Sequence, residues 1–439
     1  MFGFKKNFRK VRGGITPGHF KHTAGIQTTV LPLPEQVSIY MAQHIGAACV
    51  PTVKVGDEVK VGQVIGEWEG FIGTYVHSSV SGKVTAIDQF ILPNSNRTQT
   101  VVIKTDGLQT VSEDVKKPEV TDRESFIAAI KASGLVGLGG AGFPTWVKLS
   151  PKNLDEIDTL LINGAECEPF LTSDHRECME NGEAVMAGIA DVMHYLGIQK
   201  AVIGIESNKP DAIEKMQGLC KDYPGVEVKT LASRYPQGAE KVVMAEALGR
   251  IVPEGKLPAD VGVIVMNIST ASFIHGYLQD GMPLVKKRIT VDGDCVAQPQ
   301  NVWAPVGTPI IDLVNHCGGY VNDPKKIIVG GPMMGTAVYS DKYPVAKTTN
   351  GVLFFSEKLN KDEKTLACIR CGACADICPM GLMPPMIVAA DKAKDADELA
   401  KLKVNLCMEC GSCTFVCPSK RHITQSMREA KATLRKMGK

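Results

Sequence analysis

Several common features are missing from this sequence. No stretch of its 439 residues approaches the run of about 18 to 20 apolar residues that a membrane-spanning helix requires. Residues 1–12 lack the apolar core of a secretion signal. The formal net charge is only +2, from 49 basic and 47 acidic residues, which gives no overall reason to expect nucleic-acid binding. We therefore expect a cytoplasmic chain that has no transmembrane helix and binds no nucleic acid.

Positive charge is concentrated at the N-terminus instead. Six basic residues precede the first acidic residue, Glu35: Lys5, Lys6, Arg9, Lys10, Arg12 and Lys21. Two interpretations stay open, a solvated tail or a surface that docks to a partner subunit or to anionic lipid. We treat residues 1–47 as a basic N-terminal segment.

Short strands separated by turn signals fill residues 48–92, with turns at Gly56-Asp57 and Ser81-Gly82. The pattern resembles the barrel-sandwich of biotinyl and lipoyl carrier domains. Those carriers place a modifiable lysine on a hairpin between their halves, but the matching stretch here, EWEGFIGTY (67–75), has no lysine. Residues 48–105 therefore predict a lipoyl-like barrel-sandwich with a structural or docking role.

Residues 118–282 predict a Rossmann-like, mainly parallel α/β domain. Four apolar stretches at 159–163, 201–206, 226–232 and 261–267 suit strands buried on both faces, and the segments between them have helical length. Residues 283–356 return to turn-rich β character around one short helix, which favours a β-grasp (SLBB-like) domain. Residues 357–439 combine charged helical stretches with most of the cysteines and predict an α-helical ferredoxin-type domain. The whole is a multidomain α/β protein.

Eight of the 14 cysteines lie in two short runs, CIRCGACADICP (368–379, the first run) and CMECGSCTFVCP (407–418, the second run). Each run has the C-x2-C-x2-C-x3-C-P spacing in which three thiolates hold one [4Fe-4S] cluster and the fourth reaches the neighbouring cluster. This cross-over assigns Cys368, Cys371, Cys374 and Cys417 to cluster 1, and Cys407, Cys410, Cys413 and Cys378 to cluster 2. Structural zinc is the alternative, but zinc sites usually pair two C-x2-C units.

A glycine-rich loop, GLVGLGGAGFPTWVK (134–148), is the second candidate site. Its G-x-G-x-x-G spacing is a weak signal alone, and its context is not that of a standard Rossmann turn, because Pro144 interrupts the helix that should follow. A simple glycine-rich connector remains an alternative. Three further segments, NGAECEP (163–169), SRYPQGAEK (233–241) and MNISTA (266–271), bring polar residues to the ends of expected strands, where open α/β sheets bind ligands.

These four segments, in this order, resemble the flavin-binding subunit of respiratory complex I, which has a G-x-G-G-A-G-F-P-T loop followed by N-x-x-E-x-E-P. The sequence departs from that pattern at Ala165 and Phe170. The flavin-binding polypeptide of complex I holds one cluster, whereas this chain has two complete cysteine runs. With both runs included, nearly the whole chain is similar to the RnfC family, which belongs to the Rnf ion-translocating ferredoxin:NAD+ oxidoreductases.

The resemblance implies two cofactors, FMN and a pair of [4Fe-4S] clusters, with NAD(H) as the substrate. The residues implied for FMN are Gly137, Gly139, Gly140, Lys148, Asn163, Glu166, Tyr235, Gly238, Asn267 and Thr270. Those implied for NADH are Phe143, Lys148, Glu168 and Glu240. No acid–base catalytic residue is expected, because hydride transfer needs none.

The resemblance further implies a peripheral subunit on the cytoplasmic face of the cell membrane. Its partners would be the membrane subunits and a ferredoxin-like subunit of an Rnf complex, with ferredoxin as an indirect redox partner and Na+ or H+ as the translocated ion. Two alternatives stay open. One is a soluble NADH diaphorase subunit of a complex-I-like hydrogenase or formate dehydrogenase, and the other is a non-catalytic iron–sulfur scaffold.

Overall fold

The computed structural model describes residues 13–360 and 363–438. Five of the six N-terminal basic residues, Lys5, Lys6, Arg9, Lys10 and Arg12, lie outside the described residues, and both interpretations of the basic N-terminal segment stay predictions. In the part of the chain that is described, no helix combines the length and the apolar character needed to cross a membrane.

Two small sheets form the barrel-sandwich. One has the strand order β2-β8-β7-β4, and the other has the order β3-β5-β6. Their bounds are β2 Gln36–Tyr40, β3 Val50–Pro51, β4 Glu58–Val59, β5 Val64–Glu67, β6 Val76–His77, β7 Gly82–Ile91 and β8 Arg97–Thr105. β2 lies within residues 1–47, the expected basic N-terminal segment, yet it belongs to the barrel-sandwich. Its alternating residues Val37 and Ile39 point into the barrel core and are fully buried.

The central α/β domain is built on a four-stranded sheet in the order β11-β10-β9-β12, with every neighbouring pair parallel. The strands are β9 Thr159–Gly164, β10 Lys200–Glu206, β11 Val226–Leu231 and β12 Val263–Asn267. They coincide with the four predicted apolar stretches and confirm the parallel sheet. The helices are α1 Arg123–Ala132, α2 Thr145–Lys148, α3 Ser173–Leu196, α4 Pro210–Leu219, α5 Glu240–Leu248 and α6 Ile268–Asp280.

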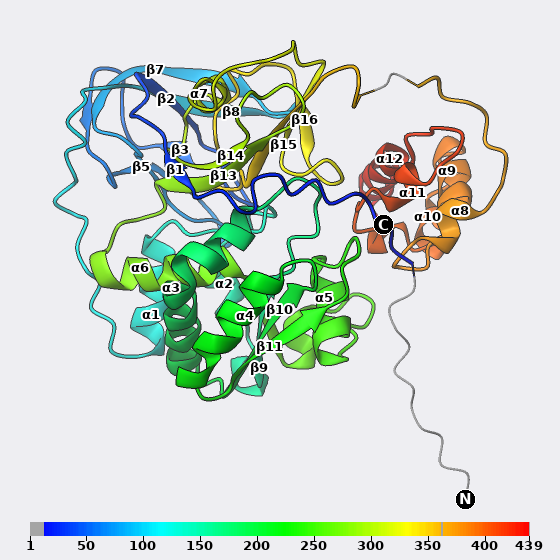
Figure 1. Cartoon of the computed structure of the whole chain (residues 1–439), viewed down its shortest axis with the longest axis horizontal. Coiled ribbons are helices and arrows are strands. Elements are labelled where there is room, and N and C mark those ends of the chain that lie inside the picture. The colour runs from blue at the N-terminus through cyan, green and yellow to red at the C-terminus, as the bar shows by residue number, and fades with distance from the viewer. Residues whose placement is uncertain (1–12, 361–362, 439) are drawn as a thin grey trace, which may run out of the picture.

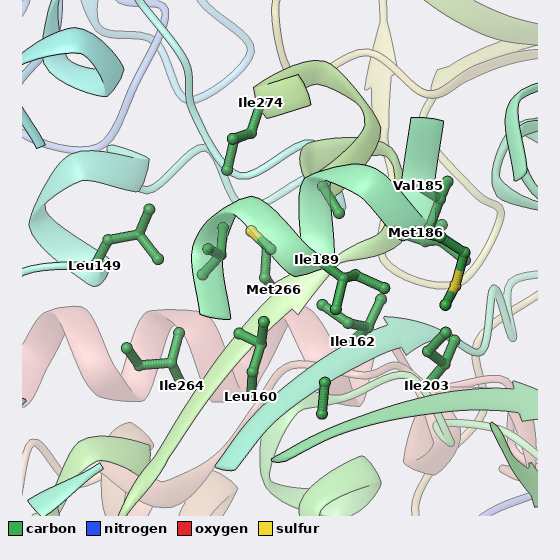
Figure 2. Packing of buried hydrophobic residues seen from close by; sticks show 14 of the residues in the cluster. Leu149, Leu160, Ile162, Val185, Met186, Ile189, Ile203, Ile264, Met266 and Ile274 are labelled. Atoms are coloured by element: carbon green, nitrogen blue, oxygen red, sulfur yellow. The ribbon is translucent and has the colours of Figure 1, made fainter. Parts of the chain in front are cut away.

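The core of this domain lies between the sheet and helices α3 and α6 (Figure 2). Leu160 and Ile162 of β9 point to this side, whereas Leu161 joins a separate cluster with Val243 and Met244 of α5 on the other side. Strand residues alternate between faces, so a strand covered on both faces must be apolar throughout. This explains why the four strand sequences are continuous apolar runs.

The β-grasp-like domain contains a six-stranded sheet in the order β1-β14-β13-β17-β15-β16. Its elements are β1 Thr29–Val30, β13 Lys286–Asp292, β14 Gln300–Pro305, α7 Ile310–His316, β15 Lys326–Val329, β16 Thr336–Val338 and β17 Gly351–Phe355. The edge strand β1 comes from the N-terminal part of the chain and runs parallel to β14. The domain is therefore completed by residues about 270 positions earlier in the chain.

The C-terminal domain is helical and sits beside the rest of the molecule (Figure 1). Its helices are α8 Ala373–Asp376, α9 Pro384–Lys392, α10 Ala396–Lys401, α11 Ser412–Phe415 and α12 Ile423–Lys436. One face of α12 packs inward. Ile423, Met427 and Leu434 recur at helical spacing and are buried in the core of this domain.

An extended segment, residues 13–28, which we call the N-terminal strap, crosses three domains. The Gly14 N–H donates to the Ile377 carbonyl of the C-terminal domain (2.9 Å). Ile15 and Tyr235 exchange two backbone hydrogen bonds of 2.7 and 2.8 Å, which fixes the strap to the α/β domain. The strap then leads into β1, so it holds three domains together.

Candidate functional site

A cavity of about 710 Å³ opens where the α/β domain meets the β-grasp-like domain. Its volume lies in the range typical of ligand pockets, about 300 to 1,000 Å³. Every residue that the sequence analysis connected with FMN or NADH lines it: Gly137, Gly139, Gly140, Phe143, Lys148, Asn163, Glu166, Glu168, Tyr235, Gly238, Glu240, Asn267 and Thr270. Four segments far apart in the sequence are thus brought around one space, while their contacts to a ligand stay predictions.

The glycine loop forms a wall of bare backbone. A methyl group added at Gly137 would meet only the Phe143 carbonyl at 3.7 Å, and one at Gly140 would meet only Asn350 at 3.8 Å. Gly140 also has φ +105°, which L side chains rarely adopt. Any side chain here would occupy space along the cavity wall, so the loop fits the close approach of a flat ring or a phosphate.

The segment after β9 is fixed by its own hydrogen bonds. Asn163 donates from its amide to the Gly238 carbonyl (2.8 Å), which ties two of the predicted segments together. The Glu166 carboxylate accepts from the backbone N–H groups of Asp174 (2.7 Å) and His175 (3.2 Å) in the first turn of α3. Glu166 therefore satisfies otherwise unpaired donors at a helix N-terminus, a structural task for a residue predicted to contact FMN.

Glu168 is held by the β-grasp-like domain. Its carboxylate accepts from the Met333 and Met334 N–H groups, both at 2.9 Å, and from the Tyr235 hydroxyl at 3.4 Å. Burial raises the pKa of Glu168, and the hydrogen bonds oppose this shift. The residue predicted to contact NADH thus also anchors the loop between β15 and β16 over the cavity.

The remaining predicted polar residues complete the wall. Lys148 and Glu240 form an ion pair of 2.7 Å. Asn267 donates to Asp174 (2.7 Å), and the Thr270 hydroxyl accepts from the Leu138 N–H of the glycine loop (3.0 Å). These contacts fix the positions of the four segments relative to one another.

Four of the eight run cysteines line one cavity, the grouping that the cross-over expects for cluster 2. Cys378 of the first run lines a small cavity together with Cys407, Cys410 and Cys413 of the second. Burial raises the pKa of Cys374, and the nearby thiols of three further cysteines raise it too: Cys371, Cys417 and Cys368. Four thiols are the donor set of a [4Fe-4S] cluster, so the cavity with Cys378, Cys407, Cys410 and Cys413 and the neighbours of Cys374 fit that cofactor, while the ligand sets stay predictions.

The second cysteine run lies directly against the large cavity. Met408, between two of its cysteines, lines the cavity wall. The hydroxyl of Tyr235, a fully buried residue of that same wall, donates to the Cys410 carbonyl at 2.6 Å. One side chain therefore connects the predicted flavin cavity with the loop that carries a predicted cluster ligand.

Lys21 is a correction to the sequence analysis, which counted it in a basic N-terminal segment that was either a solvated tail or a docking surface. Its ammonium group donates to the backbone carbonyls of Glu166 (2.9 Å), Glu168 (2.8 Å) and Leu171 (2.5 Å). Burial lowers the pKa of Lys21 to about 8. Its partners lie some 150 residues away in the sequence, so no local pattern marks its role.

The sequence analysis also missed parts of the cavity wall, and three of them carry polar contacts or come from another domain. Asp174, at the start of α3, lines the cavity and accepts from both Asn267 and Ser269. Cys167 accepts from the Gly238 N–H (3.2 Å), and burial raises its pKa to about 12. Residues 329–331 and 334–336 reach the cavity from another domain. Only Asp174 carries a usable local signal, an acid in the first turn of a predicted helix.

Four family profiles match successive parts of the chain. They are described as the RnfC barrel sandwich hybrid domain (residues 9–108), the Nuo51 FMN-binding domain (130–276), the SLBB domain (288–337) and the 4Fe-4S dicluster domain (361–421). The matches confirm the predicted fold class. They also confirm FMN and two [4Fe-4S] clusters as the cofactors, and the cavity and cysteine groups described above fit both.

Two curated relatives are similar over most of their length. The C component of the proton-translocating ferredoxin:NAD(+) oxidoreductase complex of Clostridium ljungdahlii is 40% identical over 91% of this chain and 88% of the relative. The C component of the Na(+)-translocating ferredoxin:NAD(+) oxidoreductase complex of Acetobacterium woodii is 41% identical over 85% of each. A crystal structure of an air-oxidised NAD+-reducing [NiFe]-hydrogenase has a similar fold, with a TM-score of 0.51, 20% identity and coverage of 71% of this chain and 63% of that chain.

Proposed function

This chain belongs to the RnfC family of ion-translocating ferredoxin:NAD+ oxidoreductase complexes, and we propose that it is the subunit at which such a complex exchanges electrons with NAD(H). FMN, when bound, supplies the conversion between the two electrons of a hydride and the single electrons that iron–sulfur clusters carry. The protein contributes binding, orientation and exclusion of water.

We assign the FMN site to the cavity wall made by the glycine loop and the segments after β9, β11 and β12. The bare backbone at Gly137, Gly139 and Gly140 lets the flavin approach closely, and Asn163 and Gly238 hold two of the segments in register. Lys148 adds positive charge where a phosphate or a nicotinamide dinucleotide enters. Phe143, Glu168 and Glu240 line the remaining space for the dinucleotide.

We assign cluster 1 to Cys368, Cys371, Cys374 and Cys417, and cluster 2 to Cys407, Cys410, Cys413 and Cys378. The grouping of Cys378 with the second run around one small cavity supports the cross-over. Because Met408 and the Tyr235–Cys410 hydrogen bond lie at the wall of the large cavity, cluster 2 is the one next to the flavin site.

The observation that carries the proposal is this shared wall. Thirteen predicted ligand-binding residues surround one cavity, and one of them, Tyr235, also bonds the loop of a cluster ligand. A non-catalytic scaffold would need no such cavity beside the cysteines.

The proposed partners are the membrane subunits and a ferredoxin-like subunit of the same complex, with ferredoxin as an indirect redox partner. Membership of one multisubunit complex supports this assignment. We place the chain on the cytoplasmic face of the membrane, held there by those partners, since the substrates NAD(H) and ferredoxin are cytoplasmic.

The test uses anaerobically purified protein. We expect about eight irons and one FMN per chain, and bleaching of the flavin absorbance when NADH is added. Turnover of NADH with ferricyanide should accompany the bleaching. A protein that contains iron but neither binds FMN nor oxidises NADH would be a scaffold, and the proposal would then be wrong.

A further inference from the structure

The two cysteine runs form the same local structure twice. The residue before the second cysteine has a left-handed backbone in both, with φ 56° at Arg370 and 58° at Glu409. The glycine after that cysteine has φ 81° at Gly372 and 82° at Gly411, and each glycine is followed by a four-residue helix, α8 or α11. Equivalent residues 39 positions apart can therefore be compared directly.

In the second run, this loop is covered by the rest of the molecule. Met408 lines the large cavity, and Cys410 is only 7% exposed. A methyl group added at Gly411 would lie 2.8 Å from the Met333 carbonyl of the β-grasp-like domain. The loop thus packs against the domains that hold the flavin site.

In the first run, the equivalent loop faces solvent. Ile369, the counterpart of Met408, is 66% exposed, and Cys371, the counterpart of Cys410, is exposed as well. A methyl group at Gly372 would meet nothing closer than Asp376 at 4.0 Å. In Figure 1, α8 lies farther from the body of the molecule than α11 does.

The charge around the two loops also differs. Two segments form and flank the loop of the first run, residues 363–372 and residues 418–422. Together they carry one acidic residue, Glu363, and four basic residues, Lys364, Arg370, Lys420 and Arg421. Arg421 donates to the Leu366 carbonyl, and Lys420 pairs with Glu363, so these segments lie together. The second run's loop, residues 402–411, carries one residue of each sign, Lys403 and Glu409. Both are held in ion pairs within the molecule, Glu409 with Arg428 and Lys431 of α12 and Lys403 with Glu254.

We propose that the loop of the first run, residues 364–372 with Lys420 and Arg421, is the docking surface for an acidic redox protein that carries its own one-electron centre. The surface has exposed apolar side chains, Leu366 and Ile369, at its middle and positive charge around them. The backbone of this loop has the same conformation as the loop of the second run, which packs against the domains around the large cavity. The inference rests on the proposed function and adds the place where the chain meets its partner.

The exchange at this surface moves one electron and no atoms. One centre, the cluster held by the first run or the partner's iron–sulfur or flavin centre, is oxidised by one electron, and the other is reduced by one. An exposed ligand loop leaves little protein between the two centres. Opposite charges on the two surfaces would bring the partners together and make their association sensitive to salt.

The test replaces Ile369 and Arg370 in the whole complex, as Ile369→Asp, Arg370→Glu and the milder Arg370→Ala. The matched control is Ile251→Asp, which changes a 75% exposed isoleucine in the α/β domain. Three properties are measured: retention of the subunit on membranes washed at about 0.15 M salt, ferredoxin-dependent NAD+ reduction, and iron and FMN content with NADH:ferricyanide turnover.

We expect the loop variants to lose at least about tenfold in retention or in ferredoxin-dependent turnover, the effect of substituting an interface hot spot, while iron content, FMN content and ferricyanide turnover persist. Arg370→Glu should exceed Arg370→Ala, and Ile251→Asp should behave as the wild type. Variants that keep both retention and ferredoxin-dependent turnover overturn the inference. A wild type without NADH:ferricyanide turnover would refute the proposed function instead, so the two failures are distinguishable.

Discussion

The two cysteine runs share one ligand spacing but differ in their surroundings. The loop of the second run is enclosed by the wall of the large cavity and the β-grasp-like domain, whereas the loop of the first run is open to solvent. The motif predicts which residues hold iron, because the spacing of the thiols matches the cluster. It does not specify which neighbour each cluster has. That information lies in the residues between the cysteines, such as Met408 and Ile369.

The strongest test of this difference removes one ligand from each cluster. Cys410→Ser and Cys371→Ser should each lose about four of about eight irons. Each should also lose nearly all ferredoxin-dependent turnover, roughly 100-fold or more, because both clusters lie on the same electron path and either substitution interrupts it. Anaerobic EPR after NADH addition should separate them. The cluster that remains in Cys371→Ser should be reduced by NADH, whereas the one that remains in Cys410→Ser should stay oxidised. The reverse result would exchange the positions of the two clusters.

A glycine pair tests the packing around the loops. Gly411→Ala and Gly372→Ala place the same methyl group at almost the same positive φ, so both incur the same backbone strain, about 1 to 2 kcal/mol. Only Gly411→Ala also meets the Met333 carbonyl, which should cost about 1 to 3 kcal/mol more. Thermal unfolding of the cofactor-loaded variants should therefore show the lower midpoint for Gly411→Ala. Equal midpoints would mean that Gly411 is packed no more tightly than Gly372.

Tyr235→Phe removes the hydroxyl that links the cavity wall to the second run. The Cys410 carbonyl loses its 2.6 Å donor, and an unsatisfied buried acceptor costs about 1 to 3 kcal/mol. We expect a measurable shift in the reduction potential of the second-run cluster, with iron content preserved. Tyr320→Phe is the control, since its hydroxyl donates to Asp341 in the β-grasp-like domain, away from both runs. A potential shift of the same size in the control would contradict this role.

The last prediction concerns the pH dependence of stability through Lys21, which bonds the backbone of residues 166–171 at the cavity wall. Burial lowers its pKa to about 8, whereas an unfolded lysine has a pKa near about 10.4. Between these two values the unfolded chain binds more protons, so this group makes the folded state gain stability as the pH rises through that window. The stability difference between wild type and Lys21→Met should therefore shift in favour of the wild type from pH 8 to about 10.4. Urea unfolding at several pH values measures it, and a pH-independent difference would show that folding does not lower the pKa of Lys21.

The sequence predicted some of these features well and could not predict others. The four buried strands of the α/β domain were predictable, because burial on both faces requires continuous apolar runs. The pairing of β1 with β14 was not, since two residues at 29–30 carry no signal for a partner some 270 positions later. Lys21 was placed on the surface for the same reason, because its three carbonyl partners come from residues 166–171.

At the site, the motifs identified the lining residues but not all of their tasks. Glu166 was predicted as a flavin contact, and the structure shows that its carboxylate also caps α3. The loop between β15 and β16 was missed, because it approaches Glu168 from a domain whose sequence shows no binding motif.

The N-terminal strap has a consequence for how the protein is made. Ile15 bonds Tyr235, Gly14 bonds Ile377, and β1 pairs with β14, so none of these contacts can form until most of the polypeptide has left the ribosome. Residues 13–30 are therefore synthesised early but pair late with the rest of the chain. They must stay unpaired until their partners have been synthesised, so their docking is a late step in the folding of the subunit.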